Sequence, residues 1–170
     1  MLWASLSLIS CNSEPTLQKY FVENTENKNF VALDVSSSIL NVDQTKLSVA
    51  QNDALQSFDK MNILAFKLTE TNKAEFETER AKVELILKDK KYQKLMKFSS
   101  GKEGVSVSFI GTDEHIKEFI FYANKKEKGF AVVRILGEDM NPTSVMDMIS
   151  VLQQSDIDLE QFKPIQQLLK

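Results

Sequence analysis

The sequence 105-VSVSFI-110 alternates apolar with hydroxyl side chains almost without interruption. This period of two is typical of a strand with one buried face, so we expect Val105, Val107 and Phe109 to face the core and the serines to face water. Three neighbouring stretches also have strand character, and Gly-, Ser- and Asn-containing loops separate them: residues 92–98, 116–123 and 130–136. Four successive strands joined by short loops predict an antiparallel meander.

The preceding sequence mixes helices with strands. Apolar residues spaced three or four apart predict helices over residues 44–59 and 73–90, with a shorter one around Leu17. Residues 30–35 and 61–68 are strand candidates, the latter apolar on both faces, and Pro142 opens a closing helix. The sequence therefore predicts an α+β fold: a mixed, largely antiparallel sheet of about six strands, with a C-terminal four-strand meander and helices packed on one face.

Composition limits the possible functions. The chain has 170 residues, about one domain, and a net charge of −3, which argues against nucleic-acid binding by phosphate neutralisation. One Cys excludes an intrachain disulfide, and one His leaves little material for a metal site or a nucleophilic triad. We expect no cofactor, no metal and no catalytic residues.

The one cysteine lies at the end of an uncharged, mostly apolar segment. Leu8-Ile9-Ser10-Cys11 resembles a bacterial lipobox, in which a small residue precedes the cysteine that receives diacylglycerol. The motif predicts cleavage between Ser10 and Cys11 and a Cys11 that carries two or more acyl chains, enough for a stable anchor. The alternative is an ordinary buried strand with an unremarkable cysteine. No Lys or Arg precedes the apolar run, so we expect the natural start to lie upstream of Met1.

These features divide the chain. We expect a signal peptide over 1–10, a lipidated Cys with a short helix and tether over 11–28, a single α+β domain over 29–153 and a C-terminal tail over 154–170. Asn12, in place of Asp, favours an outer-membrane lipoprotein that faces the periplasm.

A search for reactive groups finds few. His115 lies beside Asp113 and Glu114, but a metal site needs more ligands, so a surface turn is the better interpretation. Counting back from the loop after Ala123 places Arg134 about opposite residue 119, so that it could pair with the neighbouring Glu118 across the hairpin. A cross-strand ion pair of this kind is usually structural and contributes less than about 1 kcal/mol to stability. The lysines between Lys88 and Lys97 are best explained as a solvated helix end and strand face.

The pattern is similar to DUF4252, a domain of unknown function found in Gram-negative envelope proteins, over roughly residues 29–152. The resemblance is carried by core and turn patterns: Ser37-Ser38-Ile39-Leu40, Phe58-Asp59-Lys60-Met61-Asn62-Ile63-Leu64, Lys91-Tyr92-Gln93-Lys94-Leu95-Met96, Ile116-Lys117-Glu118-Phe119 and Phe130-Ala131-Val132-Val133-Arg134-Ile135-Leu136-Gly137. It implies a lipid-anchored envelope location and an α+β domain, with no reaction to transfer.

Three functional hypotheses remain. The first is a non-catalytic binding or accessory module, attached to the membrane through its lipid, that docks an envelope protein on an exposed sheet face or edge strand. The second is a periplasmic carrier of an apolar ligand, with a cavity between sheet and helices lined by Phe109, Phe121 and Phe130. The third is a hydrolase that uses two carboxylates from among Asp34, Glu118 and Glu138.

Overall fold

The computed structural model describes residues 14–39, 42–101 and 103–154. The predictions for Ser10, Cys11 and nearly all of the C-terminal tail fall outside these residues. The helices are α1 (Leu17–Asn24), α2 (Val49–Ser57), α3 (Lys73–Ile86) and α4 (Pro142–Gln154), with short 3-10 turns η1 (Ser37–Ile39) and η2 (Gln44–Lys46). The strands are β1 (Phe30–Ser36), β2 (Phe58–Lys67), β3 (Gln93–Ser100), β4 (Glu103–Thr112), β5 (His115–Lys125) and β6 (Gly129–Met140).

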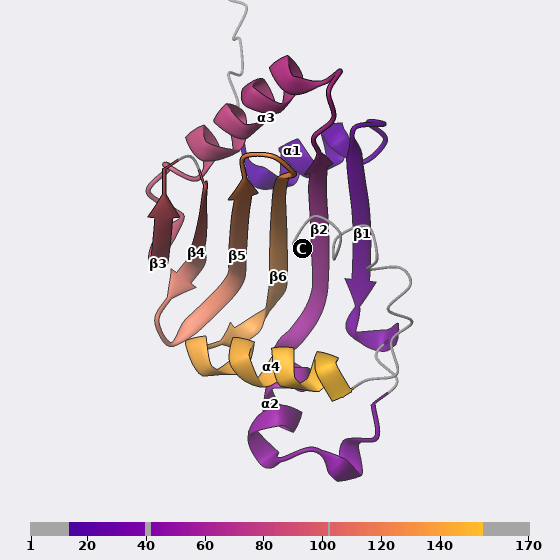
Figure 1. Cartoon of the computed structure of the whole chain (residues 1–170). Coiled ribbons are helices and arrows are strands. Elements are labelled where there is room, and N and C mark those ends of the chain that lie inside the picture. The colour runs from indigo at the N-terminus through magenta and orange to yellow at the C-terminus, as the bar shows by residue number, and fades with distance from the viewer. Residues whose placement is uncertain (1–13, 40–41, 102, 155–170) are drawn as a thin grey trace, which may run out of the picture.

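The six strands form one sheet in the order β1-β2-β6-β5-β4-β3 (Figure 1). The α+β class and the C-terminal meander of β3 to β6 are confirmed. The sheet differs from the expected mixed arrangement because every neighbouring pair is antiparallel. Strand β2 returns beside β1 and then pairs with β6, so no parallel connection is needed.

Helices cover both faces of the sheet, whereas the sequence suggested one. We call the face that α1 and α3 cover the inner face; there Leu64 and Phe66 of β2 pack with residues of these two helices. We call the opposite face the outer face; there Met61 and Ile63 of the same strand belong to the core cluster that contains Val145 of α4. Figure 1 shows α1 and α3 toward one end of the strands, and α2 and α4 at the other. The physical reason is that β2 is apolar on both faces, and each face needs a cover.

Local capping explains why α2 is shorter than expected. The Ser48 hydroxyl accepts a hydrogen bond from the Gln51 amide, and the Gln51 side chain accepts one from the Ser48 amide. This capping box starts the helix at Val49. Phe58 already belongs to β2, so the predicted helix over 44–59 loses residues at both ends.

A buried ion pair joins β5 to β6. Arg134 Nε lies 2.6 Å from Glu118 Oε1 and Arg134 Nη2 lies 3.2 Å from Oε2. Their side chains are only 7% and 11% exposed, and the guanidinium carbon lies 5.3 Å from the centre of the Phe21 ring of α1. Arg134 is paired with Ile120 rather than with residue 119, because Gly129 pairs with Lys125 around a three-residue loop. The cross-strand pair of Arg134 with Glu118 that the sequence suggests is therefore confirmed, and it is buried and bidentate.

Removing one partner of this pair leaves the other charge buried. We predict that Glu118→Gln lowers the free energy of unfolding by about 3 kcal/mol. The double variant Glu118→Leu/Arg134→Met removes both charges and should recover most of that loss. Urea unfolding of the variants measures the effect, and a single variant as stable as the parent chain would contradict a structural role.

Candidate functional site

Strand β3 is the outermost strand of the meander, and all eight of its residues are exposed. Four apolar side chains on β3 and β4 are open to solvent: Leu95 (49% exposed), Met96 (55%), Phe98 (69%) and Val105 (43%). We call these four residues the β3 apolar patch. Exposed apolar side chains that gather on one edge of a sheet, rather than lying singly, indicate an interaction surface.

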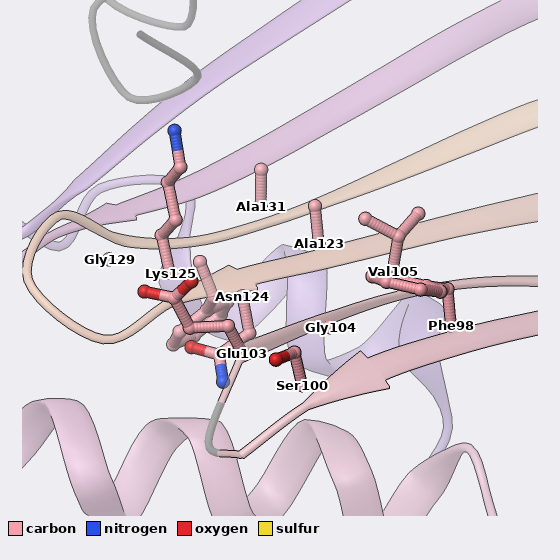
Figure 2. A pocket seen from close by; sticks show the side chains of 11 residues that line it. Phe98, Ser100, Glu103, Gly104, Val105, Ala123, Asn124, Lys125, Gly129 and Ala131 are labelled. Atoms are coloured by element: carbon pink, nitrogen blue, oxygen red, sulfur yellow. The ribbon is translucent and has the colours of Figure 1, made fainter.

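The strand register extends this patch inward across the outer face. Phe98 pairs with Val105, Val105 with Ala123, and Ala123 with Ala131. Figure 2 shows Val105, Ala123 and Ala131 pointing to the same side of the sheet. The small alanines leave a shallow hollow between larger neighbours, so that a pocket of about 280 Å³ opens here.

We call this hollow the outer pocket. Its walls come from the ends of β3 to β6, and its full lining is Phe98, Ser100, Glu103, Gly104, Val105, Ala123, Asn124, Lys125, Gly129, Phe130 and Ala131. The floor is apolar, while Glu103 and Lys125 supply charges (Figure 2). An apolar floor with a few polar groups suits an apolar side chain or a small apolar ligand.

A second, polar groove of about 370 Å³ lies on the inner face of the same strands, beside α3. Ser106, Ser108 and Tyr122 contribute hydroxyls to it, and Lys88, Lys94 and Lys97 contribute positive charge. Ser108 is only 3% exposed, because α3 covers this face. The expectation that Ser108 faces water and that Val105 is buried is therefore wrong, whereas Ser106 is half-buried and Val107 and Phe109 are buried as predicted.

Electrostatics in the inner groove keep its phenol neutral. Burial raises the pKa of Tyr122, and the nearby Glu84 charge raises it further. The Tyr122 hydroxyl donates a 3.4 Å hydrogen bond to Glu84 Oε1. Arg80 neutralises this carboxylate with a 2.7 Å salt bridge and forms a second one to Glu77 at 2.6 Å.

The three candidate carboxylates do not converge. Asp34 is exposed on β1 and accepts a hydrogen bond from Asn62, while Glu118 on β5 is held by Arg134. Two strands separate β1 from β5, which puts their backbones roughly 14 Å apart. Glu138 is exposed near the end of β6. This placement separates Asp34 from Glu118 by more than direct contact allows.

His115 forms a surface contact, as its sequence position suggests. Its Nδ1 lies 2.8 Å from Oδ1 of Asp139, and the two side chains are 67% and 79% exposed. Among the residues that the structure describes, no group of three or more His, Cys, Asp or Glu side chains is placed to hold a metal ion.

The aromatic residues proposed for a carrier cavity lie in different places. Phe130 belongs to the inner-face core with α1 and α3, and Phe109 belongs to the outer-face core. Phe121 is partly buried against that second cluster. The three rings thus line no common cavity between sheet and helices; of the three residues, Phe130 contributes to the outer pocket.

The β3 apolar patch should be dispensable for folding. We predict that Phe98→Ser changes the free energy of unfolding by less than about 0.5 kcal/mol, because the ring is already exposed. The same variant should clearly reduce binding of an apolar fluorescent dye. Leu85→Ser, which removes another exposed apolar side chain on α3, is the matched control and should leave dye binding unchanged. Equal dye binding by the parent chain and Phe98→Ser would show that the outer pocket takes up no apolar group.

Comparison with known proteins gives one assignment. Within the described residues, none of the helices combines the length and apolarity needed to cross a bilayer. Comparisons with curated proteins and with solved structures find no match. The family described as Domain of unknown function (DUF4252) matches residues 20–148, a span that runs from α1 into α4 and includes every strand of the sheet. The chain belongs to the DUF4252 family.

Proposed function

We propose that this protein is a lipid-anchored envelope protein that acts as a non-catalytic binding module. The β3 apolar patch beside the outer pocket is the observation that carries the proposal. In this account Ser10–Cys11 is the processing site, Cys11 carries the lipid, and the domain faces the periplasm from the outer membrane. The lipobox-like segment supports the anchor, and the separation of Asp34 from Glu118 supports a role without acid–base catalysis.

The occupant that best suits the β3 edge is an extended segment of an envelope protein. An added strand would gain affinity from backbone hydrogen bonds to β3 and specificity from side-chain pockets. A bulge between Lys94 and Met96 interrupts regular pairing at Leu95, which leaves Met96–Ser100 as the regular part of the edge. Phe98 and the outer pocket favour an apolar partner residue, and exposed Lys97 favours an acidic one.

A second candidate function is a carrier of a small apolar ligand. The observation in its favour is the outer pocket, whose volume of about 280 Å³ lies near the lower end of small-molecule sites. A ligand bound there would cover the same apolar side chains as a partner segment. The two functions therefore predict the same sensitive residues and differ in what is recovered with the protein.

Metabolic labelling with a palmitate analogue tests the anchor. We expect the full-length chain expressed in a Gram-negative host to incorporate the label and Cys11→Ala to lose it, because only the Cys11 thiol can be alkylated. Equal labelling of the two chains would refute the assignment of Cys11.

Site-specific crosslinking tests the docking surface. A photoreactive residue in place of Met96 should form a discrete crosslink in the intact envelope, and Phe98→Ser in the same chain should weaken that crosslink at least fivefold, or about 1 kcal/mol. The matched control places the photoreactive residue at Val49, which is 78% exposed on α2. A protein product that depends on Phe98 supports the docking module, and a small apolar molecule in its place supports the carrier. A product indifferent to Phe98, or equally strong at Val49, contradicts both.

A further inference from the structure

The chain enters the folded domain beside the start of β3. Thr16 caps α1, and the backbone amide of the next residue, Leu17, donates a 3.2 Å hydrogen bond to the Tyr92 hydroxyl. Leu17 is 1% exposed and Tyr92 is 5% exposed, so this contact is fixed in the core. Tyr92 immediately precedes Gln93, the first residue of β3. The contact joins residues 75 positions apart and fixes the start of α1 beside the start of β3.

Chain length then limits how far this point can lie from the anchor. Six residue steps separate Cys11 from Leu17, and even a fully extended chain covers no more than about 20 Å over that length. A bilayer that holds acyl chains on Cys11 must therefore lie close to Tyr92. With the proposed anchor, the surface around Tyr92 lies within about 20 Å of the bilayer.

That surface carries unbalanced positive charge. Residues 88–94 contain four lysines and one aspartate in a chain whose net charge is −3. We call Lys88, Lys90, Lys91 and Lys94 the basic cluster. Lys88, Lys90 and Lys94 are exposed, and Lys91 is half-buried with its Nζ 5.1 Å from the centre of the Tyr92 ring.

The neighbouring acidic groups do not neutralise these lysines. Within the part of the chain that the structure describes, none of the basic cluster takes part in a salt bridge. Asp89 accepts a 2.9 Å hydrogen bond from the Lys91 backbone amide, and Glu84 binds Arg80. Glu23 and Glu79 on the adjoining helices pair with Lys19 and Lys82.

We propose that the basic cluster binds anionic lipid headgroups of the bilayer that carries the anchor, and so holds the domain in one orientation. The inference rests on the proposed lipid anchor. From sequence alone these lysines resemble a solvated helix end, and the structure adds their position beside the emerging tether. Lysines within a Debye length of an anionic surface are attracted to it, and a tether of this length keeps the cluster near the membrane surface. Exposed Leu85 precedes the cluster in sequence and offers apolar contact at the headgroup level.

Vesicle binding tests this proposal without the lipid. The protein is the full chain with Cys11→Ser, which cannot be acylated, and the probes are vesicles of mixed phosphatidylglycerol and phosphatidylcholine or of phosphatidylcholine alone. We expect binding that requires phosphatidylglycerol and weakens as salt is raised. Lys88→Glu/Lys90→Glu/Lys94→Glu should bind the anionic vesicles at least about tenfold more weakly.

The matched control is Lys28→Glu/Lys46→Glu/Lys67→Glu, which makes the same charge change on exposed lysines of the chain between α1 and the end of β2. It should reduce binding less than about twofold, because these lysines lie outside the basic cluster. Equal losses in the two triple variants, or no preference for phosphatidylglycerol, would overturn the proposal. Circular dichroism confirms that each variant is folded.

The anchor and the headgroup site can fail separately. Palmitate labelling that is lost in Cys11→Ala would support the anchor. Vesicle binding that is equally strong with and without phosphatidylglycerol would, in the same protein, refute the binding of headgroups by the basic cluster. Binding that requires phosphatidylglycerol in a chain that takes up no label would support the headgroup site and refute the anchor.

Discussion

The pairing of β2 with β6 runs from Phe58 to Lys67, and the rest of the structure depends on the two apolar faces that it creates. Leu64 and Val132 are fully buried on the inner face, and Met61 and Ile135 are buried on the outer one. The strands approach closely at Gly129, whose φ is +134° and where a Cβ would lie 1.9 Å from the Phe66 carbonyl oxygen. Since both faces need cover, α1 and α3 are held on one side and α4 is held against the other.

With α1 and α3 on one face and α4 on the other, the β3 edge of the sheet is less covered than its centre. Apolar exposure rises from β5 outward: Phe119 is fully buried, Val105 is 43% exposed and Phe98 is 69% exposed. The outer pocket and the β3 apolar patch lie where the cover provided by α4 ends. On the inner face, α3 covers Ser108 but leaves a polar groove beside it. The candidate binding surfaces thus follow from the same constraint that builds the core.

Much of this fold could be predicted from periodicity. Alternation locates β4 and places Val107 and Phe109 in the core, and it predicts the meander. It fails at Val105 and Ser108 because a period of two separates two faces without saying which part of each face a helix covers. The sequence also suggests the pair of Arg134 with Glu118, but its register is off by one residue, because Arg134 lies opposite Ile120, and its burial is not predicted. The outer pocket and the contact of Leu17 with Tyr92 depend on register and tertiary packing, which a single sequence does not report.

We propose that an envelope partner docks at the β3 edge. Amide hydrogen exchange over Gln93–Ser100, compared between the purified chain and the protein in intact envelopes, tests it most directly. We expect slower exchange along Met96–Ser100 in the envelope, because a docked segment would bond the outward-facing amides, and no change in β1, the opposite edge. Unchanged exchange in β3, or slowing confined to β1, would show that no partner docks at β3.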